Sequence, residues 1–481
     1  MNSKKINYSI INSIIIIINI VLLCISNTVN KKSLSLINNI QFISIIAILL
    51  FIYITVSWKS INKRLLSPYY AFFVMLFICT CGQVFLWAFN LSAGFRDLKI
   101  WYNSRYTSWE ICNGLIFSLL CVTFLHFIVC IEKKNEDKQS REIITINQRN
   151  TYNKIVVLGM AFTIIFFVPY FLNWKSSYHI ISIYGYDAQY DLVLYGISSI
   201  FSKLSSFFPV GILTLLFVWG KKDEFNKNNY LLKKIFLIFI CLVYFAFELS
   251  LGQRTSIILF LLAFIFIRYK NSKIPVKKII IYCIIGIALM AFMRVINIVR
   301  SGENISSYKS NNFVVDFVGD AGWNLMSLIE FTKLIPAKLQ FSKGFSYVIS
   351  LTELIPNLNF WSVHPAYEYG NISNVIRETL GFNFGFGCTP VAEAYYNFGY
   401  FGFIIFYFWG KIISIIDEKY KSLRFVDNYF SILFIGILLK SCVRSSFFSV
   451  FRPFIIFILI PTFLIKFYLK ENITNKKEVK V

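Results

Sequence analysis

Residues 111–131 read ICNGLIFSLLCVTFLHFIVCI, an apolar run without Asp, Glu, Lys or Arg. A transmembrane helix needs about 20 mainly apolar residues, so this run is long enough to cross a bilayer. Similar runs recur along the 481-residue chain, in which 57% of residues are hydrophobic and 15% are charged. A soluble domain carries about 25% charged residues. We therefore predict an all-α, polytopic integral membrane protein.

The apolar runs predict about twelve transmembrane helices. They cover residues 8–26, 39–57, 69–90, 111–131, 155–172, 198–219, 235–250, 255–268, 279–298, 396–416, 429–443 and 447–468. The run 255–268 is short for a span, and Lys440 interrupts the run 429–443. The segment after Lys4 and Lys5 stays apolar for about 20 residues, which fits a first span better than a cleaved signal peptide.

The distribution of basic residues predicts the orientation of these spans. The 48 Lys and Arg residues give a net charge of +24, but they lie in short segments between apolar runs. Nucleic-acid binding would require them on one soluble surface, so we expect no nucleic-acid partner. If the N-terminus is cytosolic, the inner segments hold 28 of the 48, whereas the outer loops 27–38, 91–110 and 173–191 hold 2, 3 and 1. The positive-inside rule then predicts that both chain ends are cytosolic.

This topology divides the chain into three parts. Residues 1–298 form an N-terminal bundle of about nine spans, residues 299–395 form one large outer loop, and residues 396–481 form the C-terminal helices and a cytosolic tail. From Val314 to Leu328 apolar residues recur at helical spacing with polar residues opposite, which predicts an amphipathic helix that lies at the interface or caps the bundle. We expect the loop to fold against the membrane domain.

Two further stretches of the loop have a predicted structure. Residues 344–356 form a second apolar stretch of similar character. Thr389 and Pro390 are residue types preferred at the N-cap and at the first position of a helix. They predict a helix that begins there and continues into the next span.

Five arginines are predicted to share the outer side of the membrane. They are Arg254, Arg294, Arg300, Arg444 and Arg452. Arginine suits bidentate recognition of phosphate, and the positive-inside rule disfavours arginine on this side. These residues are therefore candidates for binding a phosphate-bearing substrate. The alternative is that each one snorkels or forms a structural pair, for instance Arg254 with Glu248.

Few carboxylates and histidines are predicted on the outer side. Glu393 precedes Asn397 by four residues, so both share one helix face, although Glu393 alternatively only complements the helix dipole. His364 lies in the outer loop and can act as a base near neutral pH, or it has no role at all. Glu353, Glu368 and Glu378 are alternative outer carboxylates for the same role, and His126 lies within a span.

The cysteine pattern and the known metal motifs point away from cofactors. Nearly all of the ten cysteines lie within predicted spans, and Cys388 is the one in the outer loop. The sequence contains no Walker A loop, no H-E-x-x-H, no G-x-S-x-G and no cysteine spacing typical of zinc. We therefore expect no disulfide, no metal site and no cofactor.

Three features together resemble the Wzy-type O-antigen polysaccharide polymerases, the oligosaccharide repeat-unit polymerase family. They are the turn Gly252-Gln-Arg254 between two spans, the large late outer loop, and the segment GFGCTPVAEAYYNFG at 385–399. The local motifs cover roughly residues 245–410, and the span pattern covers the whole chain.

The resemblance implies inverting, metal-independent glycosyl transfer at the periplasmic face of the bacterial cytoplasmic membrane. It implies that a glycan on undecaprenyl diphosphate passes to a sugar hydroxyl of a new lipid-linked repeat unit. In this scheme Arg254, Arg294 and Arg300 hold the diphosphate, and Glu393 or His364 is the base. By analogy the bundle is similar to the C-type glycosyltransferase fold with a periplasmic lid.

The resemblance also implies partners and leaves alternatives. A chain-length regulator and a flippase of the same pathway are the expected protein partners, beside membrane lipid. A lipid-linked oligosaccharide flippase is one alternative function, although such transporters usually have short loops and internal repeats. An O-antigen ligase, which shares the architecture but uses lipid A core as acceptor, is another.

Overall fold

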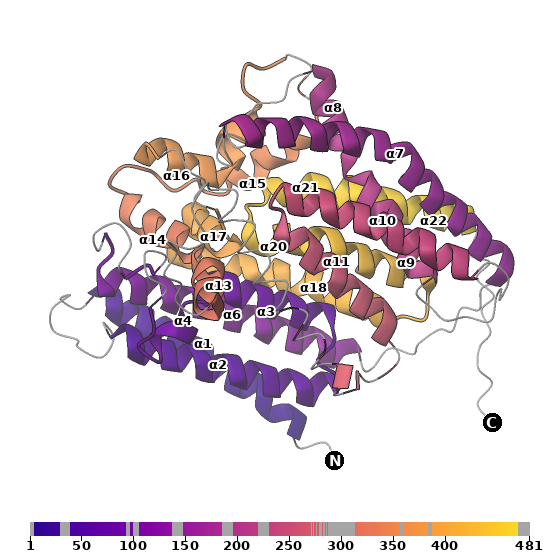
Figure 1. Cartoon of the computed structure of the whole chain (residues 1–481). Coiled ribbons are helices and arrows are strands. Elements are labelled where there is room, and N and C mark those ends of the chain that lie inside the picture. The colour runs from indigo at the N-terminus through magenta and orange to yellow at the C-terminus, as the bar shows by residue number, and fades with distance from the viewer. Residues whose placement is uncertain are drawn as a thin grey trace.

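The computed structural model describes most of the chain as helix. The described residues are 4–28, 39–92, 97–99, 105–136, 148–184, 196–219, 230–270, single positions between 272 and 286, 313–355, 357, 360–382 and 387–469. Within these ranges there is no β-strand. Figure 1 shows long helices that lie side by side in one bundle. The prediction of an all-α protein is confirmed.

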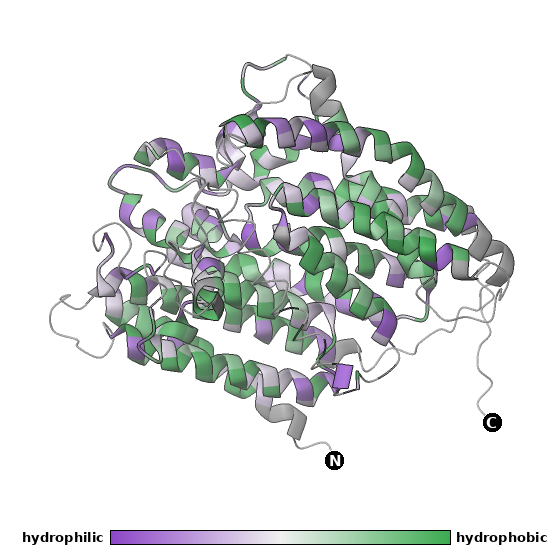
Figure 2. Ribbon diagram, in the orientation of Figure 1, coloured by the Kyte–Doolittle hydropathy of each residue, from purple (hydrophilic) through white to green (hydrophobic). Residues whose placement is uncertain are grey.

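Eight helical segments in the described ranges are long and apolar enough to cross a membrane. They are Tyr8–Thr28, Ile40–Asn62, Ser108–Lys133, Lys154–Ile183, Phe201–Trp219, Pro390–Lys421, Phe425–Arg444 and Phe448–Phe467. Figure 2 shows hydrophobic residues along the length of these helices. The protein is therefore a polytopic integral membrane protein, as the apolar runs predict.

These segments are made of the following helices, of which most α-helices are labelled in Figure 1. They are α1 (Lys4–Thr28), α2 (Ile40–Asn62), α6 (Ser108–Glu136), α7 (Gln148–Tyr184), α8 (Gly196–Ser205) with α9 (Phe207–Trp219), α17 (Pro390–Phe398) with η5 (Gly399–Ile404) and α18 (Ile405–Lys421), α19 (Phe425–Leu433) with η6 (Phe434–Leu438) and α20 (Leu439–Arg444), and α21 (Phe448–Pro453) with η7 (Phe454–Leu459) and α22 (Ile460–Leu469).

Three of the remaining predicted spans are also helical. They contain α3 (Pro68–Cys81) with the short α4 (Val84–Trp87), α10 (Tyr230–Ser250) and α11 (Arg254–Tyr269). The predicted span 279–298 lies almost entirely outside the described residues. The count of twelve spans therefore stays a prediction.

Local sequence sets where two important helices begin. Before α6, the Thr107 hydroxyl oxygen accepts a hydrogen bond from the Glu110 amide at 3.3 Å, and the Glu110 carboxylate accepts one from the Thr107 amide at 2.7 Å. This reciprocal capping box satisfies two donors at the start of the helix. Before α17, the Thr389 hydroxyl oxygen accepts from the Ala392 amide at 3.2 Å, and Pro390 is the first helical residue. The predicted start of that helix is confirmed.

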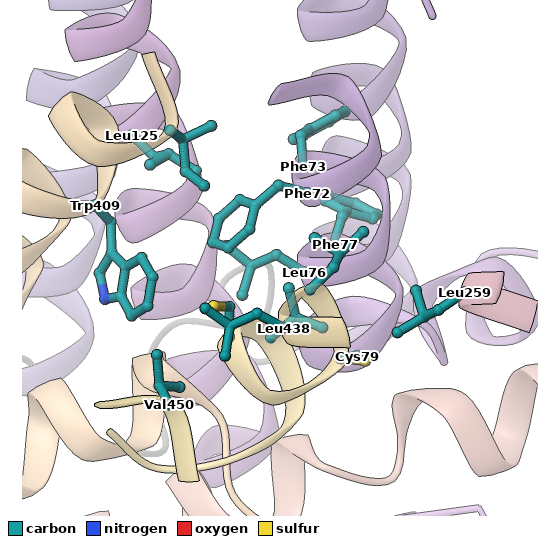
Figure 3. Close-up of a cluster of buried hydrophobic side chains, with 14 of the residues drawn as sticks. Phe72, Phe73, Leu76, Phe77, Cys79, Leu125, Leu259, Trp409, Leu438 and Val450 are labelled. Carbon is teal, nitrogen blue, oxygen red and sulfur yellow. The ribbon is translucent and has the colours of Figure 1, made fainter. Parts of the chain in front are cut away.

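The opening stretch 111–131 forms the centre of the bundle, in α6. Buried residues make up 83% of its apolar window, against 28% for α1. Figure 3 shows the neighbouring core, in which Phe72 of α3 lies near Leu125 of α6 and Trp409 of α18. The ring centroids of Phe72 and Trp409 are 5.8 Å apart. The helix that the sequence marks most clearly as a span is thus enclosed by other helices.

Segments predicted to share a side of the membrane meet in the structure. At one end, the Arg64 guanidinium donates to the Lys270 carbonyl at 2.9 Å, and the Lys270 ammonium donates to the Ser422 carbonyl at 2.7 Å. These residues belong to three predicted inner segments. Arg105 of a predicted outer loop instead contacts Glu330 of the large outer segment, at 2.7 Å. Predicted inner segments thus contact inner segments, and predicted outer segments contact outer segments. Which end of the bundle faces the cytosol stays a prediction from the distribution of charge.

The large outer segment is helical and packs onto the bundle. Its elements are α13 (Phe313–Gly322), α14 (Leu325–Leu334), α15 (Phe345–Ser350), η3 (Leu351–Leu354), η4 (Ala366–Gly370) and α16 (Ile372–Leu380). The amphipathic helix predicted from Val314 to Leu328 is two helices, because α13 ends at Gly322. In α14 the polar residues Ser327 and Glu330 are as buried as the apolar ones. This helix therefore packs within the interior of the protein, while its position relative to the membrane surface stays a prediction.

A close crossing joins α13 to the turn after α3. A Cβ on Gly82 would lie 3.0 Å from the Cα of Gly322, so only glycines allow this approach. The Gln83 side chain fills the crossing, since its amide nitrogen donates to the Gly319 carbonyl at 3.0 Å and its oxygen accepts from the Leu98 amide at 3.1 Å. The crossing fixes the outer segment against the N-terminal helices.

Candidate active site

Glu393 lies buried in the first turn of α17. Its side chain is 1% exposed. The Ser346 hydroxyl donates to Oε1 at 3.2 Å, and the Phe447 backbone amide donates to Oε2 at 2.7 Å. Both carboxylate oxygens therefore have partners, one from α15 and one from the turn between α20 and α21. Three segments that are distant in sequence meet at this carboxylate.

Asn397 orders the donor to this carboxylate. Its side-chain amide donates to the Ser346 hydroxyl and to the Glu393 carbonyl, each at 2.8 Å, and its oxygen accepts from the Gly344 amide at 2.9 Å. The helix face that Glu393 and Asn397 are predicted to share is present in the structure. Ser346 is absent from the sequence-based candidates, because it lies 47 positions before Glu393 in an apolar stretch.

The Tyr347 hydroxyl is the unusual polar group beside this cluster. It is buried and has no hydrogen-bond partner among the residues that the structure describes. Its ring centroid lies 6.5 Å from that of Phe398 and 5.6 Å from that of Phe447. Burial raises the pKa of its hydroxyl well above the ordinary value, and the negative charge of Glu393 adds to the shift. Buried polar groups are nearly always hydrogen-bonded, so this hydroxyl has unused capacity for a ligand or water.

His364 is held by the backbone of its own segment. Its Nδ1 accepts a hydrogen bond from the Ala366 amide at 3.2 Å, so Nε2 carries the proton and donates to the Ile355 carbonyl at 2.9 Å. Both nitrogens are thus used in ordering the stretch that leads into η4. No contact among the described residues joins His364 to Glu393.

Arg452 of α21 forms a buried ion pair with Glu353 of η3. The guanidinium Nη1 lies 3.2 Å from Glu353 Oε1, and each side chain is 14% exposed. The second oxygen of Glu353, Oε2, is buried, and no described residue forms a hydrogen bond with it. Burial raises the pKa of Glu353 to about 7, although the positive charges of Arg452 and Lys203 oppose the shift. The ion pair therefore leaves a carboxylate oxygen unsatisfied.

The turn that contains Arg254 touches α20. The Lys440 ammonium donates to Gln253 Oε1 at 3.1 Å, and Arg254 is the first residue of α11. The Arg254 side chain is outside what the structure describes, so its predicted pairing with Glu248 stays untested. Glu248 Oε1 accepts a hydrogen bond from the Tyr170 hydroxyl at 2.8 Å.

Of the other predicted arginines, the structure describes Arg444. Arg444 ends α20 with an exposed side chain, within electrostatic range of Lys440. Arg294 and Arg300 are outside the described residues. The structure therefore places Arg444 and Arg452 on one segment. That Arg294 and Arg300 lie on the same side of the membrane stays a prediction.

One segment, residues 439–453, connects these features. It comprises α20, a turn and α21, and it carries Lys440, Arg444, the Phe447 amide that binds Glu393, and Arg452. The two arginines are among the predicted site residues, whereas Lys440 is not. Its position inside an apolar run is nevertheless a signal of function, because ionisable residues at membrane depth are costly.

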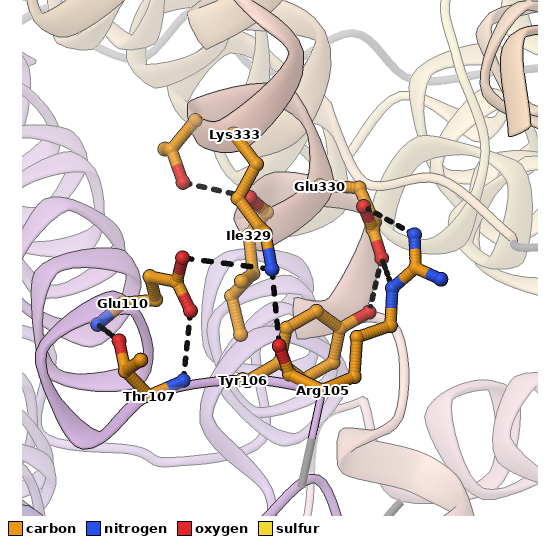
Figure 4. Close-up of polar contacts among 8 residues, drawn as sticks. Arg105, Tyr106, Thr107, Glu110, Ile329, Glu330 and Lys333 are labelled. Carbon is orange, nitrogen blue, oxygen red and sulfur yellow. Dashed lines mark hydrogen bonds and ion pairs between the residues drawn. The ribbon is translucent and has the colours of Figure 1, made fainter. Parts of the chain in front are cut away.

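A second polar cluster supports α17 from α14 (Figure 4). Arg105 donates from Nε and Nη2 to the two oxygens of Glu330 at 2.7 and 3.3 Å, and the Tyr106 hydroxyl donates to Glu330 Oε1 at 2.7 Å. Burial, together with the charge of Glu330, raises the pKa of Tyr106 well above its ordinary value. Next to Glu330, the Phe331 ring stacks on Tyr396 of α17 at 4.8 Å. The cluster therefore positions the helix that carries Glu393.

The described side chains offer no gathering of metal ligands. Across these ranges, no three His, Cys, Asp or Glu residues approach one another closely enough to hold a metal ion. What the site does offer is a buried carboxylate, an unpaired tyrosine hydroxyl and several cations. Such groups can bind hydroxyls and phosphate oxygens.

The sequence matches the protein family described as O-antigen polysaccharide polymerase Wzy over residues 8–477, nearly its whole length. No curated protein and no solved structure matches the chain. The family match includes the membrane helices and the outer segment, and with them Glu393, Glu353 and the segment 439–453.

Proposed function

The chain belongs to the O-antigen polysaccharide polymerase Wzy family, and from this premise we propose that it joins oligosaccharide repeat units carried on undecaprenyl diphosphate. The product is O-antigen or capsular polysaccharide. The reaction takes place at the outer face of the bacterial cytoplasmic membrane, with both chain ends in the cytosol. The charge distribution among the predicted loops supports this orientation.

The proposed reaction is a single, inverting displacement without a metal. An acceptor sugar hydroxyl attacks the anomeric carbon of the donor glycan, and the bond between that carbon and the diphosphate oxygen breaks. The acceptor proton passes to a protein base, and the diphosphate leaves with the negative charge. The chain must therefore supply a base for the hydroxyl and cations for the leaving group.

The contact that supports the proposal best is the hydrogen bond of 2.7 Å between the Phe447 amide and Glu393. Phe447 lies between Arg444 and Arg452, so the carboxylate sits against the segment that bears two of the proposed diphosphate ligands. We assign Glu393 as the base and Arg444 and Arg452 as diphosphate ligands. The unpaired Tyr347 hydroxyl is a suitable partner for an acceptor hydroxyl.

The remaining predicted residues keep proposed roles. Arg254 follows Gln253, which bonds to Lys440, so it is a further candidate for the diphosphate. Arg294 and Arg300 are proposed for the same role on the predicted topology alone. We favour Glu393 over His364 as the base, because the one basic lone pair of His364, on Nδ1, already accepts the Ala366 amide, whereas each Glu393 oxygen that accepts one hydrogen bond keeps a second lone pair.

The test replaces Glu393 with Gln, which keeps the shape and the hydrogen-bonding capacity of the side chain. Loss of a general base typically costs about 10²- to 10⁴-fold in rate. We expect cells with Glu393→Gln to lose the long glycan ladder on a gel while the protein level stays normal. Glu378→Gln, at an exposed carboxylate of the same outer segment, is the matched control. Undiminished long chains in Glu393→Gln would refute the assignment.

The same gel separates this function from its alternatives. A cell without a polymerase retains single repeat units on its surface, whereas a cell without a flippase displays none. A cell without a ligase also lacks surface glycan but accumulates polymer on the lipid carrier. A flippase and a chain-length regulator of the same pathway remain the proposed protein partners.

A further inference from the structure

The helical stretch formed by α15 and η3, residues 345–354, turns its apolar residues outward and its polar residues toward the protein. Its exposed residues are large and apolar: Phe345 is 51% exposed, Val348 63%, Leu351 44% and Leu354 41%. A helix on the surface of a water-soluble protein turns such residues toward the core. Here the spacing of three residues puts them all on one outward face.

The polar residues of the same stretch face the protein. Ser346 and Ser350 are fully buried, and Glu353 is 14% exposed. Ser346 donates to Glu393, and Glu353 pairs with Arg452. Ser350 packs against Gly370, where an added Cβ would lie 2.7 Å from its hydroxyl oxygen. The buried face is thus committed to the candidate active site. On the outward face, Phe345 contacts the ring of Tyr369 at 6.1 Å between ring centroids, and Tyr369 is itself 48% exposed.

The outward face adjoins the apolar surface of a candidate span. A Cβ on Gly344, at the start of α15, would lie 3.2 Å from Cζ of Phe398, and the rings of Tyr347 and Phe398 stack at 6.5 Å. Phe398 and the following Phe401 belong to the candidate span Pro390–Lys421 and are 38% and 76% exposed. Further along this span Phe408 is 59% exposed. The outward face therefore continues the apolar surface of a candidate membrane span.

We propose that the outward face of residues 345–354 is a docking surface for phospholipid acyl chains of the outer leaflet. The stretch lies at the edge of the hydrocarbon without crossing it. Apolar side chains that would be unfavourable in water are favourable there, and the buried serines and Glu353 remain shielded from lipid. This inference extends the proposed function, which requires only that the site open to the outer side, and it holds independently of which reaction occurs there.

The test uses the full-length protein with Phe345→p-benzoylphenylalanine, a substitution that keeps an aromatic ring at this position. The purified variant is placed in vesicles of phosphatidylethanolamine and phosphatidylglycerol that contain no polyprenyl lipid. After irradiation, mass spectrometry of the intact protein measures phospholipid adducts. The same photoreactive residue at Phe408 is the positive control, and at the exposed Lys338 of the outer segment it is the negative control.

We expect the adduct yields at positions 345 and 408 to agree within about twofold, and the yield at 338 to be at least about fivefold lower. Val348→p-benzoylphenylalanine gives a second measurement on the same face and decides the result if the Phe345 variant does not fold. A yield like that of Lys338 at both 345 and 348, with strong labelling at 408, would overturn the proposal. The vesicles hold no substrate, so this outcome is separate from the polymerase test.

Discussion

Replacing Arg105 with alanine would leave the Glu330 carboxylate buried with a single remaining donor. Glu330 is 1% exposed, and Arg105 supplies two of its three hydrogen bonds, at 2.7 and 3.3 Å. The third comes from the Tyr106 hydroxyl at 2.7 Å. The buried carboxylate cannot reach bulk water. Losing the guanidinium therefore removes its positive partner and two of the three hydrogen bonds that replace water around it.

The geometry sets the expected size of the effect. Removing one partner of a buried ion pair costs about 3–5 kcal/mol, and we expect the lower end because the Arg105 side chain is 23% exposed and partly screened. Tyr106→Phe removes one hydrogen bond to a charged group, which costs about 1.5–3 kcal/mol. Glu330→Gln removes the charge but keeps an acceptor, so we expect about 1–2 kcal/mol.

The double variant Arg105→Ala with Glu330→Gln gives the sharper result. Once the buried charge is gone, losing Arg105 destabilises the protein less. The losses of unfolding free energy in the two single variants should therefore add up to at least about 1 kcal/mol more than the loss in the double variant. The assay is unfolding of the purified protein in mixed micelles by titration with SDS. Lys338→Ala, at an exposed position, is the control and should change stability by less than about 0.5 kcal/mol.

The reasoning fails if Arg105→Ala destabilises the protein no more than Lys338→Ala does. It also fails if the effects of Arg105→Ala and Glu330→Gln are additive, because independent effects would mean that the two side chains do not share a buried charge pair.

Three other predictions concern the outer segment. Thr389→Ala removes the cap of α17 and should lower stability by about 1 kcal/mol in the same titration, whereas Thr389→Ser should restore it. Gly322→Ala should destabilise strongly, by more than about 2 kcal/mol, because the new Cβ meets the backbone of Gln83. Gly286→Ala should not, because its Cβ would meet no described atom within 4 Å beyond its own helix and chain neighbours. Burial raises the pKa of Glu353 from 4.5 to about 7, so the folded protein holds this proton more tightly than the unfolded chain. Stability should therefore fall as the pH rises from about 4.5 to about 7, and the loss of that slope in Glu353→Gln is the check.

The membrane helices were predictable because their signal is local. A run such as 111–131 carries its own length and composition, and Thr389 with Pro390 carries its own helix start. The same locality explains why Glu393 and Asn397 were correctly placed on one helix face. These features depend on residues at most four positions apart or on one continuous run.

The partners of the site were not predictable, because they are set by which helices pack together. Ser346 and the Phe447 amide reach Glu393 from 47 and 54 positions away, and Glu330 meets Arg105 across 225. Hydropathy also cannot tell which face of an amphipathic stretch points outward. It indicated that residues 344–356 were amphipathic, but the burial of Ser346 and the exposure of Val348 follow from the surroundings.

The crossing between Gly82 and Gly322 bears on the order in which the protein is assembled. The Gln83 amide finds its acceptor on Gly319, 236 positions later in the chain. During synthesis the five long apolar segments described before α13 are therefore made while Gln83 still lacks the Gly319 carbonyl. Its polar groups must be satisfied by water or by other proteins until α13 arrives. The N-terminal bundle thus reaches its final packing only after about two thirds of the chain has been made, and a truncated N-terminal fragment should be a poor substitute for it.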